Sequence, residues 1–231
     1  MDKLITTLDS KALVVSKNNL HELTKHITKD ITNNKNLLWF ETLWSWADAN
    51  KIDEKVLPRS IVPLLKLSNL NLSNLNLYSI PKELYNLDNL EELSLYNNVL
   101  QNLPLGIVNL KNLKRIDLSK NCFEVFPTSV CSLKNLKELH IRSNWIQTIP
   151  KEIKYLKQLK YLDMFNNLLI ALPDEIGELD SIIEMDFLQN NLCEVPPSII
   201  KLNNLISFRV KNNNIKTIPK ELFGIKEVII C

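Results

Sequence analysis

The sequence predicts an α/β solenoid, with a curved parallel β-sheet on the concave side, short helical or 3-10 segments on the convex side and an α-helical N-terminal cap. Seven of the 10 prolines recur at intervals of 23 residues, which indicates a structural repeat of that length. Apolar residues between them follow the frame LxxLxLxxNxLxxLPxxIxxLxx, as in "LKELHIRSNWIQTIP". The repeating prolines are Pro81, Pro104, Pro127, Pro150, Pro173, Pro196 and Pro219.

Each slot of the frame predicts a local structure. Apolar and polar residues alternate in LxL, which is typical of a short strand with one buried face, so successive copies should stack as a parallel sheet. An asparagine follows each strand, where its amide can donate to and accept from the backbone of neighbouring coils. Proline then fixes φ at the first position of a short helical turn. The asparagines are Asn98, Asn121, Asn144, Asn167, Asn190 and Asn213.

Residues 1–66 lack the period and are predicted to form the helical cap, whereas residues 67–231 form seven repeats and the start of an eighth strand. A first helix is predicted from Asn19, at a capping-box sequence. A second, starting near Leu37, carries an apolar stripe that would cover the first coil. The first repeat has Leu75 in the asparagine slot, as expected where a repeat array meets its cap. The stripe is Trp39, Phe40, Leu43, Trp46 and Ala47.

These repeats resemble the leucine-rich repeat (LRR) family, in its 23-residue type with LPxxIxxL on the outer side. They are most similar to bacterial LRR proteins and to the plant intracellular Ras-group-related LRR class. The resemblance covers residues 67–231. In the bacterial class it implies an effector that binds a host protein. In the plant class it implies a module that binds a small GTPase or a signalling enzyme.

Composition and charge disfavour several classes of function. The net charge is only +2, so no global field recruits nucleic acid or an anionic membrane. The N-terminus lacks the apolar core of a signal peptide, and no apolar run is long enough to span a bilayer. The four cysteines show no CxxC spacing, which favours a reducing compartment. We therefore expect a cytoplasmic protein, or one that is secreted into a host cell by a route independent of a signal peptide.

The sequence shows no catalytic constellation, so we expect no enzyme activity, cofactor or metal. The three glycines are isolated within return segments and make no phosphate loop. His21 and His26 are five residues apart and would face different sides of a helix. Asp163 and Asp186 occupy one slot of adjacent coils, roughly 4.8 Å apart. They could share a proton or bind a cation, but we favour a polar binding face with basic residues nearby.

The predicted functional site is the concave face, onto which the third, fifth and seventh residues of the frame point. Large apolar groups occupy three of these slots, at Tyr161, Phe165 and Leu188. Trp145 follows Asn144 and is expected to face outward, because other residues fill the core slots of its coil. Its alternative role is to shield the edge of the coil. The predicted protein-binding residues are Tyr96, His140, Arg142, Trp145, Tyr161, Asp163, Phe165, Asp186, Leu188 and Arg209.

The sequence thus predicts a non-enzymatic protein-interaction module. Eight strands would offer a face of roughly 600 Å², close to one partner's share of a small interface. The alternative is the substrate-recognition arm of a ubiquitin-ligase system without its own catalytic domain. "LPRSIVPLL" at residues 57–65 resembles an F-box start, although we favour a packing linker. At the C-terminus, Val228–Cys231 belongs to a tolerated or truncated edge strand, or joins a weak homodimer through that strand.

Overall fold

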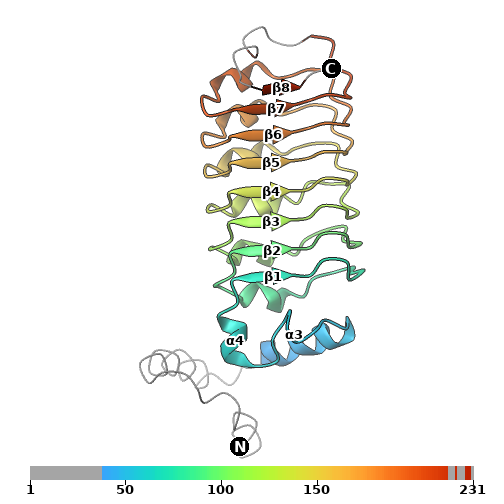
Figure 1. Ribbon diagram of the computed structural model, residues 1–231, viewed down its shortest axis with the longest axis vertical. Helices are drawn as coiled ribbons and strands as arrows, with labels where there is room; N and C mark the ends of the chain where they lie inside the picture. Colours follow the sequence, from blue (N-terminus) through green and yellow to red (C-terminus); the bar gives the residue numbers. More distant parts are fainter. Residues whose placement is uncertain (1–37, 218–221, 223–226, 230–231) are drawn as a thin grey trace, which may run out of the picture.

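The computed structural model describes residues 38–217, 222 and 227–229, which form a stack of coils with the strands along one side (Figure 1). Eight strands make one parallel sheet in the order β1 to β8. Equivalent residues of successive coils pair in register, as Leu139 does with Ile116 and Leu162. The predicted parallel sheet is confirmed, including its eighth strand. The strands are β1 Asn69–Asn71, β2 Glu92–Ser94, β3 Arg115–Asp117, β4 Glu138–His140, β5 Tyr161–Asp163, β6 Glu184–Asp186, β7 Ser207–Arg209 and β8 Glu227–Ile229.

Short 3-10 helices lie behind the sheet and close each described coil. Each begins directly after a repeat proline, and the carbonyl of Pro81, for example, accepts a hydrogen bond of 3.1 Å from the N–H of Leu84. The proline therefore precedes the helix, where its extended ψ suits the approach, and does not occupy the expected first helical position. The helices are η1 Lys82–Asn86, η2 Leu105–Asn109, η3 Thr128–Ser132, η4 Lys151–Tyr155, η5 Asp174–Glu178 and η6 Pro197–Lys201.

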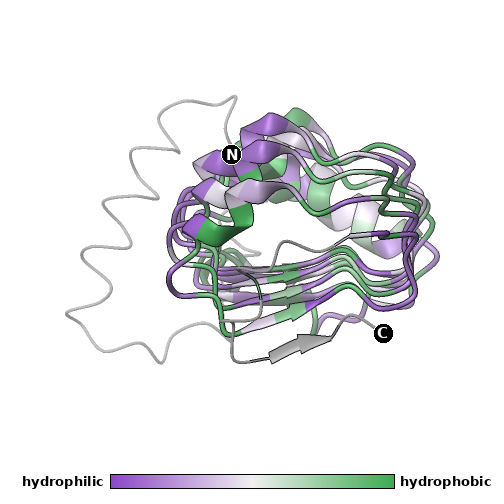
Figure 2. Cartoon of the chain, turned by 90° about the horizontal axis from the view of Figure 1, so that it is seen from above, coloured by the Kyte–Doolittle hydropathy of each residue, from purple (hydrophilic) through white to green (hydrophobic). Residues whose placement is uncertain are grey.

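One continuous apolar core lies between the sheet and the 3-10 helices, and the coils wrap around it when the stack is viewed from above (Figure 2). The spine residues of the frame are buried, among them Leu139, Ile141 and Leu162. Phenylalanines extend the core toward the C-terminal coils, where the rings of Phe187 and Phe208 meet edge to face with centroids 6.1 Å apart. Burial of the spine leaves the alternate residues of each strand on the outer surface of the sheet, called the sheet face below.

The asparagine column forms a buried hydrogen-bonded ladder after the strands, as predicted. Asn144 Oδ1 accepts from the N–H of Phe123 at 3.1 Å, and its Nδ2 donates to the carbonyls of Leu118 and Ile141. Each of these carbonyls also accepts from the asparagine of a neighbouring coil, since Asn121 donates to Leu118 O and Asn167 to Ile141 O. Adjacent coils are therefore joined by shared amides, which satisfy the backbone groups that each turn buries.

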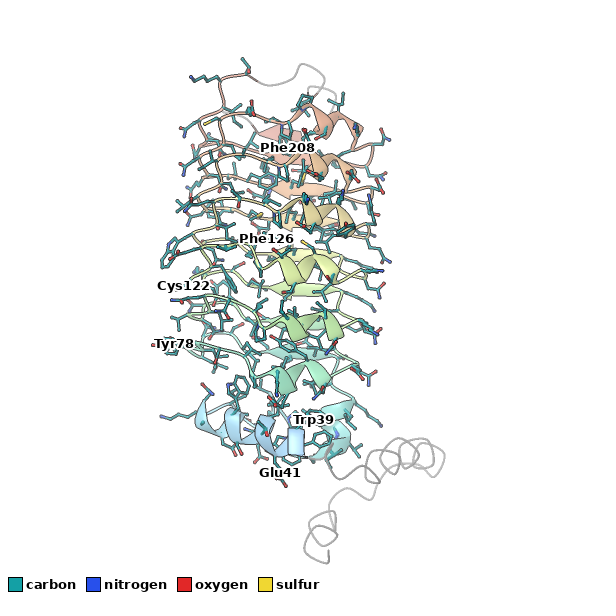
Figure 3. The ribbon with its side chains drawn as sticks, turned by 180° about the vertical axis from the view of Figure 1, so that it is seen from behind. Trp39, Glu41, Tyr78, Cys122, Phe126 and Phe208 are labelled. Carbon is teal, nitrogen blue, oxygen red and sulfur yellow. The ribbon has the colours of Figure 1, made fainter. Side chains whose placement is uncertain are left out.

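The N-terminal side of the array is covered by α3 (Leu38–Ala49) and α4 (Ile61–Leu65). Phe40, Leu43 and Ala47 of α3 are buried in the core, which confirms the apolar stripe of the second predicted helix. Trp39 lies on the side of α3 that faces the coils and Glu41 points away from them (Figure 3). The first predicted helix, with His21 and His26, lies outside the described residues.

The segment from residue 57 to residue 65 packs onto the array. Leu57 and Leu64 are fully buried, and the indole N–H of Trp44 donates to the carbonyl of Pro58 at 3.0 Å. Arg59 reaches back to α3, where its Nη2 lies 2.8 Å from Asp48 Oδ1. These contacts favour the packing linker over an F-box start.

Candidate protein-binding face

Strands β2 to β7 position nine of the ten predicted binding residues on or directly beside the sheet face. In each three-residue strand, the first and third residues point outward from the sheet. The residue two positions after the strand's end, such as Phe165 after β5, also points outward. The parallel register then places equivalent residues of adjacent coils side by side, as with Asp163 and Asp186. The face is therefore a grid whose columns run along the stack.

An ionic network crosses the middle of this grid from β3 to β5. Arg115 Nη1 lies 2.7 Å from Glu138 Oε2, and the same oxygen lies 3.4 Å from His140 Nε2. His140 Nδ1 is 3.6 Å from Asp163 Oδ2. Arg142 approaches that oxygen with both Nε, at 2.8 Å, and Nη2. Charges from three adjacent strands thus hold one another in place, and the end of the Arg142 side chain remains about half exposed.

The two aspartates predicted to neighbour each other differ in their environments. Burial acts to raise the pKa of Asp163, but hydrogen bonds from His140, Arg142 and the N–H of Phe165 outweigh it and hold that pKa below its ordinary value. Burial raises the pKa of Asp186, and the negative charge of Asp163 adds to the effect. Asp163 is thus an ion-paired carboxylate, which matches the polar-face interpretation better than a shared proton does.

His140 is held between two carboxylates. The hydrogen bond with Asp163 raises the pKa of the imidazole, burial opposes the shift, and the contact with Glu138 adds to it. Glu138 was not among the predicted binding residues, although it connects Arg115 to His140. Its position in the first outward slot next to Arg115 was visible in the repeat alignment, but period alone does not reveal which neighbours pair.

Three large apolar side chains lie beside the network, one in β5 and two in the equivalent slots that follow β5 and β6. Tyr161, Phe165 and Leu188 are each partly exposed, as predicted for offered side chains. On the N-terminal side, the ammonium group of Lys120 lies 5.2 Å above the ring centroid of Tyr96, a contact that the sequence did not suggest. At the C-terminal side, Arg209 Nη1 lies 3.8 Å from Asp186 Oδ2. The predicted residues other than Trp145 therefore form one band along the sheet face.

Trp145 belongs to a different surface, the lateral turn that follows the asparagine. The backbone N–H of Trp145 donates to the carbonyl of Phe123 at 2.9 Å, and the side chain is 50% exposed. Leu168 occupies the same slot of the next coil and is 41% exposed, whereas Cys122 in the preceding coil is half-buried. Half of the tryptophan surface is thus offered at the edge of the coil and half is covered.

Some residues expected on the sheet face are buried. Asp163 is only 7% exposed because His140 and Arg142 cover it, so its carboxylate is a support for these residues more than an exposed contact. Ser119 and Ser207 were also expected to face outward and are buried. Ser119 Oγ accepts from the N–H of Arg142 at 3.2 Å, which ties it to the neighbouring coil.

The aspartates in the last position of the strands also stabilise the turns that follow, a role that the sequence did not suggest. Oδ1 of Asp117, Asp163 and Asp186 accepts the N–H of the residue two positions later, at 2.9, 3.2 and 3.0 Å. Asn71 makes the same bond to Ser73 in the first coil. The recurrence of Asp or Asn in one slot was the available signal, since such short side chains favour turns of this kind.

Among the described residues, no group of three or more histidine, cysteine, aspartate or glutamate side chains could hold a metal ion. Within the same ranges, no helix combines the length and apolar character needed to cross a bilayer.

Comparisons with known proteins agree with the coil geometry. A family model described as leucine rich repeat matches residues 111–169. An LRR protein of Leptospira interrogans is 36% identical over 73% of this chain and 44% of its own length, with a TM-score of 0.71. A comparison with curated protein sequences found no match.

Two further structures are also similar to the chain. One is the LRR ectodomain of the membrane receptor kinase GASSHO1/SCHENGEN3 from Arabidopsis thaliana, in complex with CASPARIAN STRIP INTEGRITY FACTOR 2. It is 26% identical over 73% of this chain and 21% of its own length, with a TM-score of 0.65. The other is PEPR1–AtPEP1, at 28% identity over 72% and 25% of the two chains, with a TM-score of 0.63. The chain spans less than half the length of each of these three structures.

Proposed function

We propose that this chain, which is a leucine-rich repeat protein, is a non-enzymatic module that binds a folded protein on its sheet face. The observation that carries the proposal is the partial exposure of Tyr161, Phe165 and Leu188 on one face, beside ion pairs that are already formed. A soluble protein gains little from exposing such side chains together. Interfaces, in contrast, concentrate their binding energy in aromatic and arginine side chains surrounded by polar contacts.

The ionic network supports specific recognition more than raw affinity. Arg115, His140 and Arg142 are held by carboxylates of their own sheet, so they present donors in fixed positions and lose little freedom when a partner binds. Fixed charges of both signs favour a partner with the complementary pattern and disfavour others. The proposed site extends over side chains of several adjacent strands of one sheet, which suits a protein surface better than a small molecule.

The comparisons add support for a protein partner. The structure of GASSHO1/SCHENGEN3 is a complex with CASPARIAN STRIP INTEGRITY FACTOR 2, and PEPR1 is paired with AtPEP1. We carry over to this chain only the general class of partner, a polypeptide held by the repeat array.

The test compares two double variants with matched chemistry. Tyr161→Ala with Phe165→Ala removes the aromatic rings from the sheet face, whereas Tyr78→Ala with Tyr155→Ala removes two exposed rings elsewhere on the coils. Immobilised wild type and both variants are incubated with native lysate, and bound proteins are quantified by mass spectrometry. We expect a partner that the wild type and the control variant retain and that the face variant loses by at least tenfold, since hot-spot truncations commonly cost ~2 kcal/mol or more.

A third variant serves as the control that distinguishes a loss of folding from a loss of binding. Leu162→Ala removes a buried spine residue and should lower the free energy of unfolding by about 2–5 kcal/mol through the cavity it leaves. The face variant should unfold at nearly the wild-type temperature. Equal recovery of the partner by the wild type and the face variant would remove the sheet face as the site.

The identity of the recovered partner then separates the narrower proposals. A host protein supports a bacterial effector that reaches a host cell without a signal peptide, and a small GTPase supports a cytoplasmic signalling scaffold. Recovery of a ubiquitin-ligase component supports a substrate-recognition arm, which would act without a catalytic domain of its own. Recovery of the chain itself supports a weak homodimer. In each case residues 1–66 are proposed to serve as the helical cap and residues 67–231 as the binding array.

A further inference from the structure

Lysines form a regular grid on the turns that precede the middle strands. The segments "LKNLK", "LKNLK" and "LKQLK" place one lysine in the turn and one immediately before β3, β4 and β5. All six side chains are exposed. This lysine edge lies along the side of the stack at which the strands begin, on the left in Figure 1. It consists of Lys111, Lys114, Lys134, Lys137, Lys157 and Lys160.

Backbone hydrogen bonds fix the spacing of the grid. The N–H of Lys137 donates to the carbonyl of Lys114 at 2.7 Å, and the N–H of Lys160 donates to that of Lys137 at 2.8 Å. Asn135 Nδ2 donates to the carbonyl of Lys111 at 2.8 Å, which ties the turns together as well. Successive lysines in each column are therefore anchored roughly 4.8 Å apart, close enough for their ammonium groups to act on one bound anion.

The charges of the lysine edge are only partly neutralised. Lys114 pairs with Glu91 at 2.6 Å, and Lys157 lies 3.3 Å from Asp180 and 3.7 Å from Glu178. The other four lysines make no side-chain hydrogen bond or ion pair with any residue in the described ranges, and two of them, Lys134 and Lys137, belong to the coil between those of Lys114 and Lys157. The small net charge of the whole chain thus conceals a local concentration of positive charge.

The carboxylates that flank the edge limit what can occupy it. Asp88 and Glu91 take the lysine slots of the preceding coil, and Asp180 takes the turn slot of the following one. A nucleic acid that ran along the stack, or a flat anionic membrane, would meet these negative charges after three coils. A short run of acidic side chains fits between them.

We propose that the lysine edge binds an acidic segment of the same protein that occupies the sheet face, an inference that rests on the proposed function. Lys137 and Lys160 directly precede β4 and β5, which carry the ionic network and Tyr161. A partner centred on the ionic network and Tyr161 therefore extends over the lysine edge with little further movement. Exposed, partly unpaired charges at the rim of an interface steer the encounter and raise the association rate.

The experiment uses a fluorescent hexaglutamate peptide as the probe and the full chain as the receptor. Lys134→Gln, Lys137→Gln and Lys160→Gln are combined in the edge variant. Lys66→Gln, Lys82→Gln and Lys151→Gln are combined in the control, which loses the same total charge from other exposed sites. We expect the edge variant to bind the peptide roughly tenfold more weakly at low salt and the control to change less than twofold, because screened surface pairs depend on local geometry.

Three results would overturn the proposal. Equal losses in the edge and control variants would show that only bulk charge matters. Tighter binding of an oligothymidine or of phosphatidylserine vesicles than of the peptide, through the same lysines, would assign the edge to nucleic acid or membrane. Binding of hexaglutamine as tight as that of hexaglutamate would exclude an electrostatic site.

The outcome is separable from that of the proposed function. The Tyr161→Ala, Phe165→Ala variant should bind the peptide as the wild type does, since it retains the lysine edge. With the recovered partner, the edge variant should associate more slowly and lose most of its salt dependence. An unchanged association rate with that partner would contradict the shared-partner part of the inference while leaving the sheet face in place.

Discussion

Two polar networks of this protein, the asparagine ladder in the turns and the ionic network on the sheet face, use hydrogen bonds differently. In the ladder one residue type recurs every 23 residues, and each amide serves more than one coil. On the sheet face, Arg115 and Arg142 pair forward with carboxylates of the next strand, whereas Arg209 pairs back with Asp186. The asparagine ladder recurs in successive coils and stabilises their shared backbone. The ionic network occurs once and gives one part of the sheet face a distinct arrangement of charges.

The largest expected effect comes from breaking the ladder at its centre. Asn144→Ala should lower the free energy of unfolding by about 2–4 kcal/mol, because the buried N–H of Phe123 loses its acceptor. The carbonyls of Leu118 and Ile141 lose one donor but keep the amide of a neighbouring asparagine, which limits the cost. Urea unfolding of the wild type and the variant measures the difference.

Asn135→Ala is the matched control for that loss. Asn135 also donates to a carbonyl of the preceding coil, Lys111 O at 2.8 Å, but it does so at an exposed turn where water can replace it. The expected loss is about 0.5 kcal/mol. Similar losses for the two asparagines would mean that burial does not distinguish the ladder from other turn contacts.

An intermediate effect is expected from breaking the ion pair between Arg142 and Asp163 on the sheet face. Arg142→Ala should lower the free energy of unfolding by about 1–2 kcal/mol, because it uncovers a buried carboxylate at Asp163 and removes its charged donor. The value stays below that of a fully buried pair because Arg142 is half exposed. Differential scanning calorimetry of the purified variants measures the change.

Arg115→Ala serves as the comparison, since its partner Glu138 is more exposed than Asp163. We expect a change of less than about 0.5 kcal/mol. A larger loss for Arg115 than for Arg142 would show that burial of the carboxylate is not what sets the cost. It would also weaken the view that Asp163 supports the binding face instead of contacting a partner.

Much of the fold followed from the sequence because the 23-residue period fixes which residues face inward. Leu139, Ile141 and Asn144 each recur in every interior coil or are replaced by similar residues, so one assignment applies to all coils. A second asparagine column was overlooked, although "NL" opens most repeats. Asn89 donates to the carbonyl of Leu65 at the end of α4, at 2.7 Å, and Asn112 donates to that of Asp88 in the preceding coil, at 2.8 Å. Gln158 and Ser181 interrupt that column, which obscured its period.

The candidate site was less predictable, because pairing across the grid depends on side-chain length and direction and not on the period. Asp163 and Asp186 share a slot, yet Asp163 is the more deeply covered, since Arg142 and His140 reach it from the neighbouring strand. Trp145 was expected to face outward from the slot after Asn144; that slot lies past the turn and outside the strands, and the side chain is 50% exposed there. The assignment of all ten residues to partner binding stays a prediction until the partner is identified.

The smallest expected effect concerns the charge of His140. It distinguishes the two networks, because the amides of the asparagine ladder do not ionise, whereas the ionic network contains a histidine and carboxylates. The folded protein holds the pKa of His140 above its ordinary value, so the stabilisation is fully present below the unfolded pKa and is lost as pH rises through the folded pKa. The pKa of Asp163 is lowered instead, so its contribution is present above its unfolded pKa and is lost only under acidic conditions.

Between about pH 5.5 and 8, the wild type should therefore lose stability relative to His140→Gln as pH rises, since both proteins share every other titrating group. Glutamine keeps a polar side chain at the site but cannot gain the charge that faces Asp163 and Glu138. Thermal unfolding of both proteins across this range gives the difference. If the Tm of the wild type minus that of His140→Gln stayed constant or increased with pH, Arg142 alone would hold Asp163 and His140 would be a neutral member of the network.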